Sequence, residues 1–121
     1  METMKEITIE QALILFEQNC VKQEYALYNG DSKLANHCYD KIGEMVSFLR
    51  KKHELSQLAT FYTHPNINVR LAAAAYLLPV DEKQSLKVLK EIAQAKVFES
   101  LDAQMTIREW KNGNLKNFYT L

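Results

Sequence analysis

Glycine, proline and cysteine are scarce in this chain of 121 residues, which contains 3 Gly, 2 Pro and 2 Cys. A loop that cradles a phosphate or a cofactor with backbone amides needs clustered glycines, so this composition disfavours such a site. The two cysteines, Cys20 and Cys38, lack the spacing of a metal-binding motif. We therefore predict an apolar core that forms without a cofactor or a metal, and two reduced thiols.

The chain also lacks an excess of charge and a long apolar run. Fifteen basic and fifteen acidic side chains cancel, so no field of the whole molecule attracts phosphate or a membrane surface. No apolar run reaches the roughly 18 residues of a membrane span, and the opening sequence METMKEITIE has no signal-peptide core. These absences predict a cytoplasmic protein, without membrane contact, and disfavour nucleic-acid binding. The length predicts a single domain over residues 1–121.

The most informative segment runs from His64 to Leu78, HPNINVRLAAAAYLL. Pro65 cannot continue a preceding helix, and Asn66 offers a side-chain oxygen to the first amides of a new one. From Val69 to Leu78 every residue except Arg70 is apolar or aromatic. A helix that is apolar on all sides is buried on all sides, so we expect this segment to be the central helix of an all-α domain.

Two long helices are predicted before this segment, as an antiparallel hairpin. Thr8 and Gln11 have the spacing of a capping box, and Asn29-Gly30 supplies a left-handed stop. Asp31 or Ser32 caps the second helix, which ends in the cations Arg50 to His53, more readily explained as a solvated helix end than as a phosphate site. The expected inward residues are Ile9, Ala12, Leu13, Phe16, Cys20 and Leu27, then Leu34, Cys38, Ile42, Met45 and Leu49. Cys20 and Cys38 should lie at the same height on the facing stripes.

Three further helices surround the central one in this interpretation. A short helix covers about residues 54–62. Pro79 ends the central helix, and Asp81 caps a fifth helix, whose buried face contains Leu86, Leu89, Ile92 and Ala93. Ser100 caps a sixth helix, whose expected inward residues are Leu101, Met105, Ile107 and Trp110. The apolar tail from Leu115 to Leu121 is expected to pack back on the domain, with partner binding as the alternative. No strand is needed.

One stretch of this pattern resembles a HEAT repeat, on Pro65, Asn66, Val69, Arg70, Ala73 and Ala74. The match covers about residues 55–78, whereas the helix pairs at about 8–52 and 81–111 match only in pattern. The resemblance implies that Asn66 caps the second helix of a pair, that Val69 and the alanines pack it, and that Arg70 bonds to a neighbouring repeat. The predicted fold is a short, irregular HEAT-like superhelix of about six helices.

The second half of the chain also resembles a family of small bacterial HEAT-like domains without a known reaction. The matching residues are Ala72 to Ala75, Asp81, Thr106, Trp110 and Gly113. The resemblance implies no activity of its own. Such domains often accompany polymorphic toxins and look like immunity proteins, so it implies a protein that binds a toxin.

Candidate site residues are few, and each has a structural alternative. Glu10, Glu17 and Glu24 are seven residues apart on the first helix and could meet a basic partner, although an ordinary solvent face is the favoured explanation of their spacing. His37, Asp40 and Glu44 share a helix face, but no second ligand set completes a metal site. Structural roles are expected for Asn66, Asp81 and Trp110, and for Arg70, which should bond a carboxylate or helix-end carbonyls.

These observations predict a binding module rather than an enzyme, with another protein as its partner. The most specific form is an immunity protein that neutralises a cognate bacterial toxin, for example a nuclease. One alternative is a HEAT-like protein that binds nucleic acid or repairs DNA, which needs a cationic face and an aromatic pocket. A structural subunit is the second alternative. No catalytic residue, cofactor or metal ligand is predicted.

Overall fold

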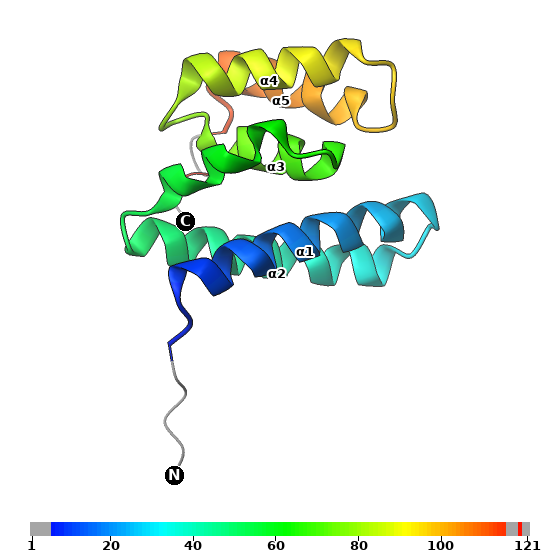
Figure 1. The fold of residues 1–121 in the computed structure, drawn as a ribbon. Helices are drawn as coiled ribbons and strands as arrows, with labels where there is room; N and C mark the ends of the chain where they lie inside the picture. The colour runs from blue at the N-terminus through cyan, green and yellow to red at the C-terminus, as the bar shows by residue number, and fades with distance from the viewer. Residues whose placement is uncertain (1–5, 116–118, 120–121) are drawn as a thin grey trace. The chain divides into compact units, whose positions relative to one another are not determined.

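The computed structural model describes residues 6–115 and 119. These residues form six helices and no strand, which confirms the predicted all-α class (Figure 1). The helices are α1 (Ile9–Tyr28), α2 (Ser32–Lys51), the 3-10 helix η1 (Leu55–Thr63), α3 (Ile67–Leu77), α4 (Glu82–Gln94) and α5 (Ser100–Lys111). The chain divides into two compact units, Met1–Glu54 and Leu55–Leu121, which we call the N-terminal hairpin and the C-terminal unit. The expectation of a single domain stays a prediction.

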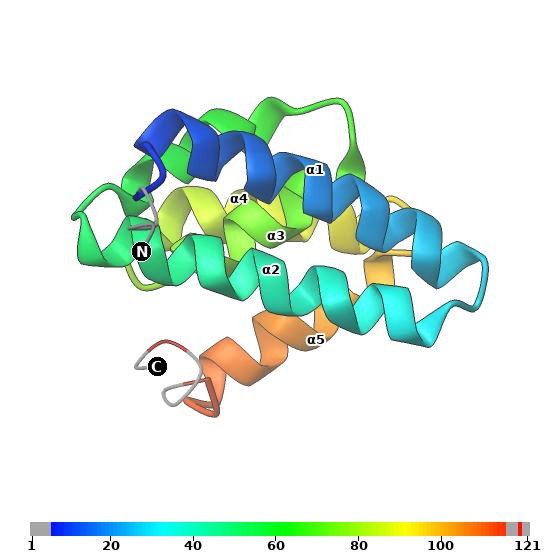
Figure 2. The same ribbon diagram turned by 90° about the horizontal axis from the view of Figure 1, so that it is seen from below.

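The N-terminal hairpin consists of α1 and α2, which run side by side (Figure 2). The predicted capping box is present: the Gln11 amide donates to Thr8 Oγ1 at 3.1 Å, and the Thr8 amide donates to Gln11 Oε1 at 2.9 Å. Gly30 has a φ of +70° and reverses the chain after α1. Asp31 then caps α2 by accepting from the Leu34 amide at 3.1 Å.

The two helices of the hairpin bury one stripe each. The buried residues are Ala12, Phe16, Cys20 and Ala26 in α1, and Ala35, Cys38, Ile42, Val46 and Leu49 in α2. The inward assignment of Leu27 is wrong, because this side chain is 40% exposed and Ala26 is buried in its place. Leu34 and Met45 are only half-buried, since the stripe of α2 runs through Ala35 and Val46.

The C-terminal unit begins with η1, which packs on α3. The short helix predicted near residues 54–62 is therefore present, with 3-10 geometry. Asn66 caps α3 as predicted, since its Oδ1 accepts from the amides of Asn68 and Val69 at 2.9 and 3.0 Å. Every residue of α3 is buried or half-buried, which agrees with its apolar sequence.

Asp81 precedes α4 but does not cap it with its side chain. The carboxylate accepts a hydrogen bond from the Tyr62 hydroxyl at 3.1 Å, and that hydroxyl lies 3.0 Å from Ser85 Oγ. Ser85 is fully buried, so the three side chains connect η1 to the first turn of α4. The predicted side-chain cap is wrong because the half-buried Tyr62 hydroxyl bonds to the same carboxylate.

The predicted start and inward face of α5 also need correction. Glu99 occupies the N-cap position, and Ser100 is the first helical residue. The Ser100 hydroxyl donates to the Ile92 carbonyl at 2.7 Å and accepts from the Val97 amide at 3.0 Å, which joins the end of α4 to α5. Ala103 is buried with Ile107 and Trp110 packed beside it, whereas Leu101 and Met105, predicted inward, are 64% and 43% exposed.

One core cluster of the C-terminal unit joins α3, α4 and α5, which pack in this order. It contains Leu71, Ala74, Leu78, Leu89, Ile92 and Ala103. The predicted return of the tail is confirmed at Tyr119, whose hydroxyl donates to the Ala75 carbonyl and whose ring meets Trp110 edge-on at 5.7 Å. Phe118 and Leu121 lie outside the described residues.

Candidate functional site

The outer face of α1 combines exposed apolar side chains with carboxylates. Ile14, Val21 and Tyr25 are 51%, 42% and 66% exposed, although large apolar residues are usually buried. They lie on the side of α1 opposite its buried stripe, because a helix turns by about 100° per residue. A shallow groove of about 470 Å³ opens on this face, lined by Glu17, Gln18, Val21, Lys22 and Tyr25.

The predicted carboxylate ridge follows one edge of this face. Glu10 is exposed, whereas Glu17 and Glu24 are half-buried. All three side chains lie on α1, so a single straight element fixes their spacing. The ridge is therefore less exposed than an ordinary solvent face, and an apolar surface lies directly beside it. This arrangement can take both an apolar group and a cation from a ligand.

The residues with predicted structural roles belong to the C-terminal unit. The Trp110 indole N–H donates to Glu82 Oε2 at 2.6 Å, so Trp110 fastens α5 to the start of α4. For Arg70 the predicted bond is absent at Nε, which is buried and has no hydrogen-bond partner among the residues that the structure describes. The residue as a whole is half-buried, but Nε itself is closed to water, so its missing bond carries a desolvation cost.

Cys20 and Cys38 are both buried thiols of the hairpin. Burial raises the pKa of each, and the nearby Cys38 and Glu17 raise that of Cys20 further. A thiol is a poor nucleophile when its pKa is high, so these residues pack the core. Within residues 6–115 and 119 no group of three or more His, Cys, Asp or Glu side chains is placed to hold a metal ion; this holds also for His37, Asp40 and Glu44.

The cluster from Arg50 to His53 lies at the end of α2. Lys52 forms an ion pair with Glu6 at 2.7 Å and lies over the Phe48 ring at 5.7 Å. One cation of the cluster therefore already has partners within the hairpin. His53 has a φ of +58° and ends the helix, with its amide donating to the Arg50 carbonyl at 3.1 Å. These contacts support the interpretation as a helix end.

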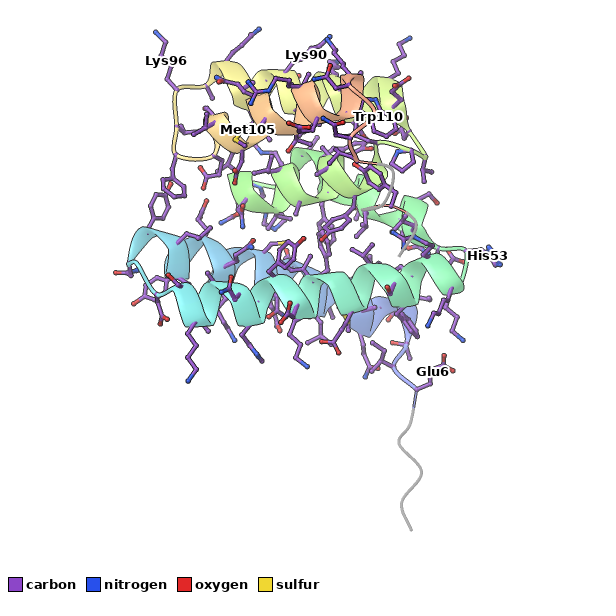
Figure 3. All side chains as sticks on the ribbon, turned by 180° about the vertical axis from the view of Figure 1, so that it is seen from behind. Glu6, His53, Lys90, Lys96, Met105 and Trp110 are labelled. Carbon is purple, nitrogen blue, oxygen red and sulfur yellow. The ribbon has the colours of Figure 1, made fainter. Side chains whose placement is uncertain are left out.

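Sequence reasoning missed two exposed surfaces. The first is the apolar face of α1 with Ile14, Val21 and Tyr25, because helical spacing alone does not distinguish an exposed apolar face from a buried one. The second is a row of exposed lysines on α4, Lys83, Lys87 and Lys90. Figure 3 shows Lys90 pointing away from its helix, and Lys96 doing so beyond the end of α4. Their spacing of four and three residues is visible in the sequence and could have identified this row.

The fold is that of an all-α protein. The chain belongs to the family described as "Domain of unknown function (DUF2019)", whose profile matches residues 10–110. No curated protein matches the chain.

A solved structure shares the fold. It is the crystal structure of the protein RPA1889 from Rhodopseudomonas palustris CGA009, with a TM-score of 0.86 and 24% sequence identity. The match covers 94% of this chain and 98% of that one. In the part of the chain that the structure describes, no helix is both long and apolar enough to cross a membrane.

Proposed function

We propose that this protein is a non-catalytic module that binds another protein through the outer face of α1. The observation that carries the proposal is the exposure of Ile14, Val21 and Tyr25 directly beside the ridge of Glu10, Glu17 and Glu24. Exposed apolar residues next to charged ones are typical of protein-binding surfaces. The raised thiol pKa values support the absence of a cysteine nucleophile.

In its most specific form the proposal is an immunity protein that neutralises a bacterial toxin. A nuclease carries a cationic groove for the nucleic-acid backbone, and a carboxylate ridge beside an apolar face is complementary to such a groove. We also propose that residues 55–78 form a HEAT-like helix pair. The cap at Asn66 and the buried Val69, Ala73 and Ala74 support it, whereas η1 is a 3-10 helix and Arg70 Nε lacks its bond.

Co-expression tests this function. The chain is expressed with the toxin domain encoded beside its gene, and cell survival and co-purification are measured. Protection that is lost in Glu10→Lys/Glu17→Lys/Glu24→Lys supports the proposal. The control is Asp40→Lys, a charge reversal at an exposed position of α2 outside the ridge. If the charge-reversed protein protects and binds as well as the wild type, the ridge is not the contact.

The lysine row on α4 favours a second candidate, binding of nucleic acid. Lys83, Lys87 and Lys90 are exposed, and Lys96 follows them. If these lysines contact phosphates, log Kd changes with log salt concentration with a slope of about 0.9 per phosphate neutralised on duplex DNA. A mobility-shift titration across salt concentrations measures this slope. Absence of any shift at low salt would exclude the second candidate.

A further inference from the structure

The outer face of α1 carries a heptad pattern that extends from its first turn to its end. Steps of three and four residues connect Gln11, Ile14, Gln18, Val21, Tyr25 and Tyr28, which we call the outer seam. Four of these six residues are apolar or aromatic, and all six are exposed. Alternating steps of three and four residues are the pattern with which one helix packs against another in a coiled coil.

The outer seam is distinct from the stripe that packs α1 within the hairpin. Phe16 and Cys20 are fully buried and point about half a turn away from Val21 and Tyr25. Helix α1 therefore has two packing faces, and only one of them is used by the core. Four of the five residues that line the groove, Gln18, Val21, Lys22 and Tyr25, have the spacing i, i+3, i+4 and i+7 of residues around a knob in a coiled coil.

Charges beside the seam define the chemistry of an occupant. Glu10, Glu17 and Glu24 each precede a seam residue by one position, so they follow one flank of the seam. Leu15 and Lys22 follow the other flank. Charges at these flanking positions determine which helix pairs with which, and in which direction. The carboxylate flank would form ion pairs with lysine or arginine on the facing flank of a partner helix.

A second copy of this chain satisfies these charges poorly. Two α1 helices packed antiparallel would bring the carboxylate flanks together, which is repulsive. Packed parallel, Glu17 would face Lys22 of the other copy, but Glu10 would face Leu15 and Glu24 would face Asn29. Only one of the three carboxylates would gain a cation, so a separate basic helix is the better fit.

We propose that the outer seam binds one amphipathic helix of another protein, with an apolar stripe against Ile14, Val21 and Tyr25 and basic side chains along the carboxylate flank. The inference rests on the proposed function and names the class of partner surface. Gln11 and Gln18 interrupt the apolar seam, and a polar residue at a seam position lowers the stability of a coiled coil. The complex is therefore expected to be reversible.

A pair of synthetic helices tests the proposal with the full chain. Both peptides have about three heptads and a leucine stripe. One carries lysine at both flanking positions, and the other carries glutamate there. Isothermal titration calorimetry should show that the lysine peptide binds at least about tenfold more tightly, since three flanking pairs of ordinary strength give about this factor. The difference should shrink at high salt because the pairs are exposed.

Substitutions in the seam provide the matched comparison. Ile14→Asp/Val21→Asp should abolish binding of the lysine peptide, and because both positions are exposed the protein should stay folded by circular dichroism. Tyr39→Asp is the control, since Tyr39 is 50% exposed on α2 and lies outside the seam. Binding to the control should equal binding to the wild type.

Four outcomes overturn the inference. The first three are equal binding of the lysine and glutamate peptides, binding of the lysine peptide to Ile14→Asp/Val21→Asp, and absence of binding of either peptide to the wild type. The fourth is self-association of the wild type that the double variant abolishes. The last result would assign the seam to a second copy. A toxin that still binds the double variant would overturn the seam alone, whereas failure to bind any protein would overturn the proposed function.

Discussion

The N-terminal hairpin and the C-terminal unit stabilise their helices in different ways. Both helices of the hairpin are 20 residues long and are capped by neighbours in sequence, Thr8 with Gln11 and Asp31 with Leu34. In the C-terminal unit the helices have 9 to 13 residues. Several side-chain hydrogen bonds there join residues 19 to 44 positions apart, as in Tyr62 to Asp81 and Tyr119 to Ala75.

This difference shows where local sequence rules suffice. A long helix repeats its inward stripe over several turns, so one ambiguous residue does not change the result. A short helix offers only three turns, and a single tertiary hydrogen bond can reassign its cap or its inward face.

The two regions also differ in charge. Residues 1–54 carry nine acidic and seven basic side chains, whereas residues 55–121 carry six acidic and eight basic side chains.

The largest effect is expected from Phe16→Ala, which tests whether the two regions unfold separately. Phe16 is fully buried in the hairpin, and its truncation should lower the free energy of unfolding by about 3–5 kcal/mol. Trp110, the single tryptophan, reports on the C-terminal unit. If the chain is one cooperative domain, the denaturation midpoints from Trp110 fluorescence and from circular dichroism should fall together. A fluorescence midpoint that stays in place would instead show two independent units.

A smaller loss is expected from Tyr62→Phe, which removes a long-range bond of the C-terminal unit. The fully buried Ser85 hydroxyl loses its neighbour at 3.0 Å, and such a loss costs about 1–3 kcal/mol. Urea denaturation measures the change. Tyr39→Phe in the hairpin is the control, because Tyr39 is 50% exposed and its substitution should leave stability unchanged. Equal stabilities of the two variants would contradict the role of the Tyr62 hydroxyl.

The Tyr62 hydroxyl should also make the stability of the protein depend on pH in the alkaline range. Burial raises the pKa of Tyr62 to about 12, from about 10 for an exposed tyrosine. Above about pH 10 the unfolded chain releases this proton while the folded chain retains it, so stability falls as the pH rises toward 12. Urea denaturation at about pH 9 and about pH 11 should show a smaller decline for Tyr62→Phe than for the wild type. Tyr119, whose pKa burial also raises, accounts for part of the remaining decline.

The sequence predicted most of the fold because most of the fold depends on local chemistry. The capping box at Thr8, the stop at Gly30 and the cap at Asn66 all involve residues close together in the chain. Asp81 and Ser100 were misassigned because their partners, Tyr62 and Ile92, become neighbours only after folding.

The candidate site was predicted only in part. Glu10, Glu17 and Glu24 were identified from their spacing, which a single helix preserves. The exposure of Ile14, Val21 and Tyr25 could not be predicted in the same way, because apolar residues on a helix are usually assigned to the core. Their steps of seven and four residues fit a packing face equally well whether its partner belongs to this chain or to another.

A helix cap tests whether local chemistry also matters within the C-terminal unit. Asn66→Ala removes the acceptor of two amide bonds at the start of α3 and should cost about 1 kcal/mol. Asn66→Asp should retain most of the stability, since a carboxylate caps as well as an amide. Thermal denaturation of both variants measures the difference. Equal losses in the two variants would show that the side-chain oxygen is not what stabilises α3 here.

The smallest changes in the free energy of unfolding are expected from two glycines of the hairpin, Gly43 and Gly30. Gly43 lies inside α2, and a Cβ added there would meet no atom within 4 Å. Gly43→Ala should therefore raise the free energy of unfolding by about 0.5–1 kcal/mol, because alanine restricts the unfolded chain without straining the helix. Gly30→Ala should lower it by about 1 kcal/mol, since Gly30 has a φ of +70° that favours glycine. Chemical denaturation distinguishes the two signs, and a destabilising Gly43→Ala would show that the outer side of α2 is closed to an added methyl group.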